Sequence, residues 1–236
     1  MSQSLDSTAH ATAGRPALAA DTLRERIVEG ELLPGTPLRD IALSAELGIS
    51  RNTLRQALRT LHEEGLVTQQ LHKGTTVRIL STADVKDIYV ARRALELTAV
   101  DESPLAPEPL LDALDAKVSA AEHAVLAHEW HKVGTASLRF HQALVALLGS
   151  ARLDDFFRVT IAQLRLAFAV MTDEAEFQAP WVEYDRKICD LIRSGRRQEA
   201  KAALRLYLDD SERQVLDAVR ANPRTEAAAT PKPRRH

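Results

Sequence analysis

The chain has 236 residues, enough for one large domain or two small ones at roughly 150 residues per domain. Its 31 Lys and Arg residues against 33 Asp and Glu residues give a net charge of −2. This balance excludes a uniformly basic, histone-like nucleic-acid binder and a strongly acidic solvating protein. The single cysteine, Cys189, excludes a disulfide framework and a thiolate zinc cluster. One free thiol fits a reducing compartment, and no apolar run approaches the roughly 18 residues of a membrane span, so we expect a cytoplasmic protein without membrane contact.

The two ends of the chain are expected to be disordered. Residues 1–16 are rich in Ser, Thr, Ala and Gly, and residues 222–236 form a basic tail broken by prolines. All ten aromatic residues lie at Tyr89 or later, which indicates a domain boundary near residue 80. The first 88 residues therefore offer no aromatic platform on which single-stranded bases could stack.

The first predicted domain combines short helices with a small hairpin. Apolar spacing predicts helices over 18–28, 40–45 and 50–61, and Ile41, Leu43 and Leu47 of the short second helix are expected to face inward. Ser50 is a plausible N-cap for the third helix. Two runs of β-branched residues then follow at 66–70 and 75–80, which predicts a hairpin with its turn at 72–74. This order of elements is that of a winged helix-turn-helix over residues 17–80.

The helix over 50–61 carries the clearest functional pattern in the chain. Arg51, Arg55 and Arg59 recur every four residues and so share one face, and no acidic residue occurs between 47 and 62. Arginine suits bidentate contacts to guanine in the major groove, where the second helix of a helix-turn-helix lies. The candidate DNA-binding residues are Ser50, Arg51, Asn52, Thr53, Arg55, Arg59, Lys73 and Gly74, the last two at the tip of the wing.

The same helix has a simpler interpretation. Three arginines on one face are also typical of a solvated helix surface with no ligand. The short helix before it, the turn at Gly48 and the Lys-Gly hairpin after it favour DNA binding over a solvated surface.

The rest of the chain shows only helical patterns. They cover 83–100, 107–127, 130–148, 151–171, 180–194 and 197–221, separated by short breaks. Short loops favour antiparallel neighbours, so residues 81–221 are expected to form an all-α antiparallel bundle. The predicted fold class is therefore mainly α, with an N-terminal winged helix-turn-helix and a C-terminal helical bundle.

The N-terminal motifs resemble those of the GntR family of bacterial transcription regulators. Residues 33–38 read LPGTPL, residues 47–58 read LGISRNTLRQAL and residues 64–67 read EGLV, which are similar to the family's "LPPGT", "LGVSRTPVREAL" and "EGLV" blocks. The resemblance implies operator contacts by residues 50–53 and Arg55, with the wing near 72–75. Ala42 departs from the family, in which many members carry an acidic residue or Arg at this position.

The helical region resembles the FCD-type effector domain of the FadR branch of this family. Three landmarks carry the resemblance: the helix at 83–96 with its Arg92 and Glu96, the FHQAL run at 140–144, and the helix end at 188–195. The resemblance implies an effector-binding and dimerisation domain over 81–221. Many such domains hold a divalent metal on one Asp and three His residues.

In this sequence the four aligned metal positions are Ser137, His141, Asp185 and Tyr207, so only His141 keeps its family identity. We therefore expect no metal cofactor; His141 and Asp185 remain as weak candidates for a zinc or nickel site. The predicted effector-binding residues are Arg92, Ser137, His141, Asp185 and Tyr207, with Arg92 facing an anionic group. An equally open alternative is that these groups pair only with one another, for example Arg92 with Asp185 or Glu96.

These observations predict a ligand-responsive transcription regulator, acting as a repressor, that binds a palindromic DNA operator as a homodimer. Its effector would be a small anionic metabolite. One alternative is an architectural DNA-binding protein without an effector. The other is an enzyme domain tethered to a DNA-binding module, but no nucleophile–base pair or phosphate-binding loop supports it.

Overall fold

The computed structural model describes residues 4–70, 74–169 and 174–222. The chain divides into two compact units, residues 1–78 and 79–236. The fold class predicted from the sequence is confirmed: the first unit is a winged helix-turn-helix, and the described residues of the second form only helices. No described helix combines the length and the hydrophobicity that a bilayer span requires.

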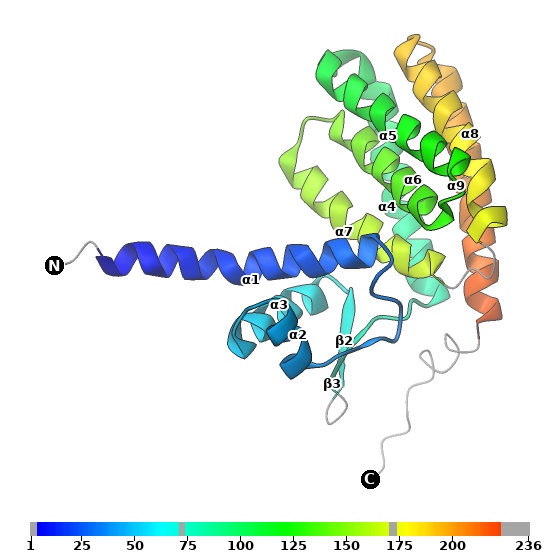
Figure 1. Cartoon of the computed structure of the whole chain (residues 1–236). Helices are drawn as coiled ribbons and strands as arrows, with labels where there is room; N and C mark the ends of the chain where they lie inside the picture. The colour runs from blue at the N-terminus through cyan, green and yellow to red at the C-terminus, as the bar shows by residue number, and fades with distance from the viewer. Residues whose placement is uncertain (1–3, 71–73, 170–173, 223–236) are drawn as a thin grey trace. The chain divides into compact units, whose positions relative to one another are not determined.

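The N-terminal unit packs three helices against a small sheet (Figure 1). Its elements are α1 (Ser4–Val28), β1 (Pro37–Leu38), α2 (Asp40–Glu46), α3 (Arg51–Glu63), β2 (Val67–Gln70) and β3 (Gly74–Val77). α1 and α2 both pack on α3. The apolar face of α3 is buried as its spacing predicts, because Leu54, Ala57, Leu58 and Leu61 recur at three- and four-residue intervals.

The sheet of this unit has the strand order β1-β3-β2 and is antiparallel throughout. The sequence predicts β2 and β3 but misses β1, because Pro37–Leu38 is only two residues long and becomes a strand only by pairing with Thr76 and Thr75. β2 and β3 pair from Val67 opposite Val77 to Gln70 opposite Gly74. The predicted wing residue Lys73 lies outside the described residues.

Two further expectations for this unit differ from the structure. Ile41 is 66% exposed, whereas the sequence predicts that it faces inward; α2 is only seven residues long, and Leu43 and Ser44 form its buried side. α1 begins at Ser4, within the segment that we expect to be disordered, and Pro16 lies inside the helix. The alanines of this segment, such as Ala9, Ala11 and Ala13, have the strongest intrinsic preference for helix.

α1 is fastened to both other helices of the unit by ion pairs. The guanidinium of Arg24 donates to Glu64 at 2.6 Å and also pairs with Asp21. Arg26 donates to Glu46 of α2 at 2.8 Å. These pairs and the buried Leu23 and Ile27 hold α3 in a fixed position, so that its other face is free to contact a ligand.

The C-terminal unit is a helical bundle built around α6. Its helices are α4 (Thr82–Glu102), the 3-10 turn Ser103–Leu105, α5 (Glu108–Leu126), α6 (Trp130–Ala146), α7 (Ala151–Phe168), α8 (Glu174–Arg193) and α9 (Arg197–Ala221). α6 packs against α4, α5, α7 and α8, while α9 packs against α4 and α8 (Figure 1). α4 starts with a reciprocal capping box between Ser81 and Asp84.

α8 starts earlier than the sequence predicts. Pro180 suggests a helix start at that residue, but α8 begins at Glu174 and contains Pro180. The proline lies in the first turns of the helix and removes one backbone donor there. Further along, Arg186 donates to Asp115 at 2.6 Å and to Glu122 at 2.8 Å, which ties α8 to α5.

Candidate nucleic-acid interface and buried polar cluster

The N-terminus of α3 is fixed by a side-chain cap. The backbone N–H of Thr53 donates to Ser50 Oγ at 3.0 Å, and the two hydroxyl oxygens lie 2.8 Å apart. Arg51 and Asn52 follow directly and are exposed. The cap thus fixes the helix end whose first residues point outward, as a helix entering the major groove requires.

The predicted basic face of α3 is solvent-exposed. Arg51, Arg55 and Arg59 are all exposed, while the opposite side of the helix forms the core. Among the described residues, the side chains of Arg51, Asn52 and Arg59 have no hydrogen-bonded or ion-paired partner. Arg55 differs, because its Nε donates to Oδ2 of Asp40 in α2 at 2.9 Å.

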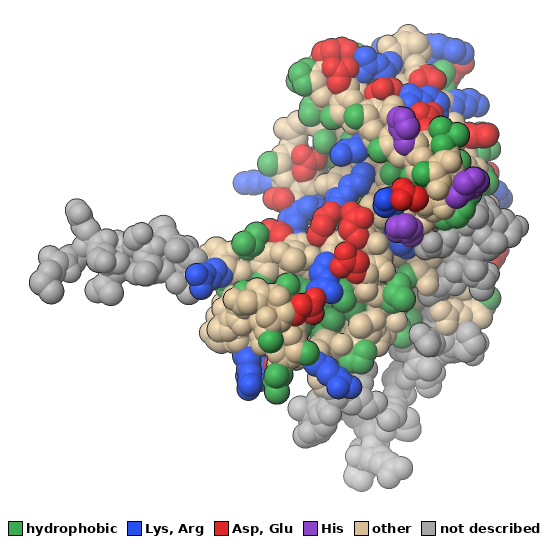
Figure 2. Space-filling view, viewed as in Figure 1, with side chains coloured by type: hydrophobic (Ala, Val, Ile, Leu, Met, Phe, Trp, Pro, Cys, Tyr) green, Lys and Arg blue, Asp and Glu red, His purple; other side chains and the backbone are tan. Residues whose placement is uncertain are grey.

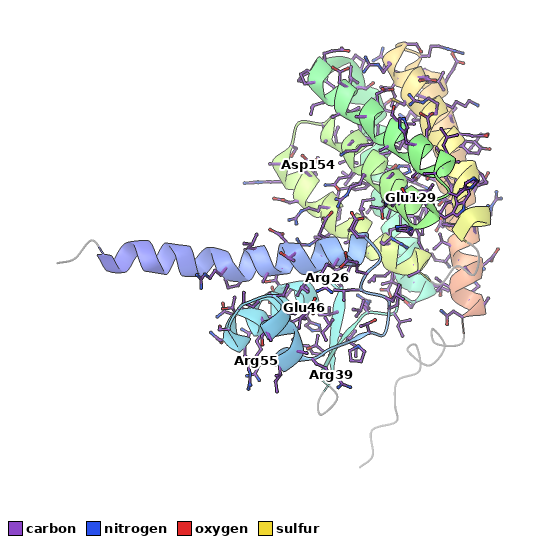
Figure 3. The ribbon with its side chains drawn as sticks, in the orientation of Figure 1. Arg26, Arg39, Glu46, Arg55, Glu129 and Asp154 are labelled. Atoms are coloured by element: carbon purple, nitrogen blue, oxygen red, sulfur yellow. The ribbon has the colours of Figure 1, made fainter. Side chains whose placement is uncertain are left out.

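Two further residues of this unit bear on the candidate interface. Gly74 opens β3 with a φ of +80°, a left-handed conformation that glycine adopts without strain, at the point where the wing turns back. Arg39, which directly precedes α2, is exposed and is not among the residues predicted from the sequence. Figure 3 shows Arg39 and Arg55 projecting from the same edge of the unit. Figure 2 shows basic side chains along this edge, on the side of α2 and α3 away from α1.

The second candidate site is a cluster of polar side chains in the centre of the helical bundle. It contains all five residues predicted to bind the effector: Arg92 on α4, Ser137 and His141 on α6, Asp185 on α8 and Tyr207 on α9. Every one of them is buried. Four helices therefore bring together groups that are far apart in the sequence.

These side chains form a continuous chain of contacts. Arg92 Nε donates to Glu96 Oε1 at 2.7 Å, and Glu96 Oε2 lies 2.7 Å from His141 Nδ1. His141 Nε2 faces Asp185 Oδ1 at 3.6 Å, which is too long for a hydrogen bond. Ser137 Oγ donates to Asp185 Oδ2 at 2.7 Å. Hydrogen bonds thus join Arg92, Glu96 and His141 on one side and Ser137 and Asp185 on the other, and none joins His141 to Asp185.

Burial decides which of these groups carry charge. Burial would raise the pKa of Glu96, but Arg92 and His141 outweigh it and lower the pKa, so Glu96 is a carboxylate paired with the Arg92 guanidinium. Burial lowers the pKa of His141, so its imidazole is neutral. Burial raises the pKa of Asp185 well above its usual range, which favours the neutral carboxyl. A neutral His141 that donates from Nδ1 to Glu96 leaves Nε2 as an acceptor.

The cluster contains several buried polar atoms without partners. In the described part of the chain they include Arg92 Nη2, His141 Nε2, Asp185 Oδ1 and the indole Nε1 of Trp181, whose ring centre lies 4.7 Å from that of Tyr207. More than roughly 90% of buried polar atoms in native proteins have a partner. Four such atoms in one bundle centre make this cluster the candidate effector site of the helical unit.

The donor set does not suit a metal ion. No group of three or more metal-ligating side chains occurs among the residues that the structure describes. Ser137 uses its hydroxyl proton on Asp185, and burial raises the pKa of Tyr207 well above its usual range, so the phenol remains neutral. Of the four aligned positions only His141 and Asp185 remain, and two side-chain ligands are fewer than the three or four that hold zinc in protein sites.

Three side chains of the cluster, Tyr89, Trp181 and Ser211, are not among the residues predicted from the sequence. Tyr89 donates to or accepts from Ser211 at 2.6 Å, and the Arg92 guanidinium lies 5.0 Å from the Tyr89 ring centre. Trp181 contributes its indole ring from α8. Tyr89, Arg92 and Glu96 lie three and four residues apart on one face of α4, and this spacing is the available signal for Tyr89.

Comparisons with known proteins agree with both units. Residues 17–77 match the family described as bacterial regulatory proteins, gntR family, and residues 87–210 match the FCD domain. The chain is 34% identical over 143 residues to an HTH-type transcriptional regulator in the TAR-I ttuE-ttuC' intergenic region of Agrobacterium vitis, covering 57% of this chain and 81% of that protein.

Two further similar proteins match different shares of the chain: one matches about a third of it and the other matches most of it. Over 84 residues the chain is 47% identical to the mannosyl-D-glycerate transport/metabolism system repressor MngR of Escherichia coli, covering 35% of this chain and 32% of that protein. A crystal structure of a GntR transcriptional regulator from Rhodococcus sp. RHA1 matches with a TM-score of 0.81 and 32% identity, covering 87% of this chain and 99% of that one.

The two family matches, the capped basic helix and the helical bundle identify the same class of protein, and it is a class of regulators rather than of enzymes. The chain is a transcriptional regulator that belongs to the GntR family and carries an FCD domain.

Proposed function

We propose that the protein is a ligand-responsive repressor that binds a palindromic operator as a homodimer and is released by a small anionic metabolite. The unpartnered atoms in the centre of the helical bundle carry the effector part of this proposal. The exposed basic face of α3 supports the DNA part. A protein that binds DNA in this way would act in the cytoplasm of a bacterial cell.

The DNA part rests on the unpaired cations of α3. Arg51 and Arg59 have no partner in the described part of the chain, so both are free to contact DNA. Arg51 lies in the first turn of α3, where a recognition helix reaches base edges, and Arg59 lies two turns further along, near a phosphate backbone. Two copies related by a two-fold axis would place two such helices on one inverted repeat.

The effector part follows from what the open atoms of the cluster require. Arg92 Nη2 and Trp181 Nε1 are donors and need an acceptor, which a carboxylate supplies. His141 Nε2 is an acceptor and needs a donor, which a hydroxyl supplies. We therefore propose a small carboxylic acid that bears at least one hydroxyl group.

The internal-pairing alternative accounts for part of the cluster. Arg92 is paired with Glu96, one of the two partners that this alternative names. The pair uses Nε of Arg92 and leaves Nη2 open, and it does not satisfy Asp185 Oδ1. The proposed ligand is compatible with the Arg92–Glu96 pair, because it would bind the open Nη2 atom of Arg92 and leave the bond from Nε to Glu96 in place.

Regulation requires that the ligand binds the two arrangements of the DNA-binding units with different affinity. A ligand that fills the cluster would fix the spacing of α4, α6, α8 and α9, which all contribute side chains to it. We propose that the fixed bundle disfavours the arrangement that fits the operator.

Thermal unfolding with matched ligands tests the effector proposal. The probes are lactate against propionate, malate against succinate and gluconate against hexanoate. We expect the hydroxylated member of at least one pair to raise the Tm more than its partner. The variant Trp181→Phe should reduce this shift, because it removes one donor and keeps an aromatic ring. A flat response across these acids and a broad metabolite panel would favour the architectural DNA-binding protein.

A further inference from the structure

The ion pair between Asp40 and Arg55 connects the two helices that form the candidate DNA-binding surface. Arg55 Nε donates to Asp40 Oδ2 at 2.9 Å. The Arg55 side chain is 69% exposed and the Asp40 side chain 32% exposed. The contact therefore lies at the surface, on the face that α3 would present to DNA.

The two partners differ in how firmly the chain holds them. Asp40 is the first residue of α2, which is anchored by the buried side chains of Leu43 and Ser44 and packs on α3. Its short side chain has little freedom relative to that helix. Arg55 has a long, flexible side chain, and the carboxylate of Asp40 restricts it to one direction.

An acidic side chain on a DNA-binding face carries a cost, because it repels the phosphate backbone. The segment 47–62, which includes most of α3, contains no acidic residue. Asp40 is therefore an exception on this face, and its carboxylate pairs directly with Arg55. Asp40 lies in the first turn of α2, where a negative charge interacts favourably with the helix dipole and stabilises the helix. A purely structural role of Asp40 is therefore the alternative to test.

The geometry of the contact leaves a specific set of donors open. Asp40 occupies Nε of the guanidinium, and Nη1 and Nη2 remain. These two atoms are the end-on donor pair that matches O6 and N7 of guanine. A guanidinium whose direction is already fixed loses less freedom on binding.

We propose that Asp40 is a positioning residue that orients Arg55 for end-on reading of a guanine in the operator. This inference rests on the proposed reading of DNA by α3. Since a surface ion pair contributes little to folding stability, the effect of Asp40 is expected in base discrimination rather than in the Tm.

The test begins with a duplex that the full-length wild-type chain selects from a randomised DNA pool. Single base-pair changes across this duplex then give a discrimination profile at one fixed salt concentration for wild type, Arg55→Ala and Asp40→Ala. We expect Asp40→Ala to weaken binding about tenfold, and to lose discrimination only at the base pair that Arg55→Ala also affects. Binding to a scrambled duplex should stay constant or rise, because a negative charge is removed.

Three further variants separate positioning from helix stability. Asp40→Glu keeps the carboxylate and should restore most of the discrimination. Asp40→Ala in the Arg55→Ala background should have no further effect on the profile. Glu46→Ala is the matched control: it removes the other acidic residue of α2 that forms an interhelical ion pair, with Arg26, and should leave the profile unchanged (Figure 3).

The outcomes distinguish this inference from the proposed function. If the wild type selects no duplex, the proposed function fails and the inference fails with it. If the wild type selects a duplex and Asp40→Ala keeps the wild-type profile, only the inference is overturned. A uniform loss at all base pairs, or a loss that persists without Arg55, assigns Asp40 a structural role and also overturns it.

Discussion

Two arginines, one in each unit, form ion pairs that differ in burial and are therefore expected to differ in their contribution to folding stability. Arg55 on α3 is 69% exposed and is held by one carboxylate at the surface. Arg92 on α4 is 1% exposed and is paired with Glu96, which is fully buried. Water screens the first pair, so its loss affects stability little. The second pair lies in a medium of low dielectric constant, where breaking it leaves a charge without compensation.

The largest expected effect is on folding, from Arg92→Ala. The change leaves the Glu96 carboxylate buried beside His141 and should reduce the free energy of unfolding by about 3–5 kcal/mol. Arg55→Ala should change it by less than about 0.5 kcal/mol. Urea unfolding of the two variants measures both. Equal stabilities would contradict the contrast between the two regions.

The next effect is on DNA binding, from Arg51→Ala. The residue has no partner in the described part of the chain, so the change breaks no contact within the fold and removes only the proposed contact to DNA. Affinity for the selected duplex should fall by about 1–3 kcal/mol with an unchanged Tm. Arg205→Ala, which removes an exposed arginine of α9, is the control and should bind as wild type does. A binding loss as large in this control would count against a local reading surface.

A third effect is a pH dependence confined to the buried region. Burial raises the pKa of Asp185 well above its usual range, so the folded state keeps a proton that the unfolded state loses from about pH 4 upward. The stability contributed by this group is full below about pH 4 and is lost as the pH rises toward the folded pKa.

Asp185→Asn has no such proton to lose. The stability of wild type relative to this variant should therefore fall by up to about 1.4 kcal/mol per pH unit within that window. Unfolding curves at several pH values measure the difference. A constant difference between wild type and Asp185→Asn would show that Asp185 is ionised in the fold.

The smallest effect is expected at the cap of α3. Ser50→Ala removes the acceptor for the Thr53 N–H and should cost about 1 kcal/mol, whereas Ser50→Gly should cost only a few tenths. Thermal unfolding compares the two variants. If both changed the Tm equally, the hydroxyl of Ser50 would not stabilise the helix end.

The exposed basic face of α3 was predictable because it depends on local periodicity. Leu54, Leu58 and Leu61 fix which side of α3 is buried, and the arginines on the other side follow from the same spacing. Ile41 was placed wrongly because two helical turns carry too few residues to define a face. The partner of Arg55 was missed because Asp40 reaches it only through the packing of α2 on α3.

Five members of the buried cluster and the Arg92–Glu96 pair were predictable from the sequence, but the other contacts of the cluster were not. The family resemblance aligned His141 and Asp185, and the structure brings them to 3.6 Å. The Glu96–His141 contact joins residues 45 positions apart, and Trp181 enters from α8, so neither follows from spacing within one helix. Such contacts depend on how four helices cross, which the sequence pattern does not determine.

Selection from a randomised duplex pool tests the central claim most directly, that α3 reads a two-fold symmetric DNA sequence. The wild-type chain should enrich an inverted repeat, and the double variant Arg51→Ala/Arg55→Ala should enrich none while its Tm stays that of wild type. Enrichment of the same repeat by the folded double variant, or of no repeat by wild type, would contradict the claim.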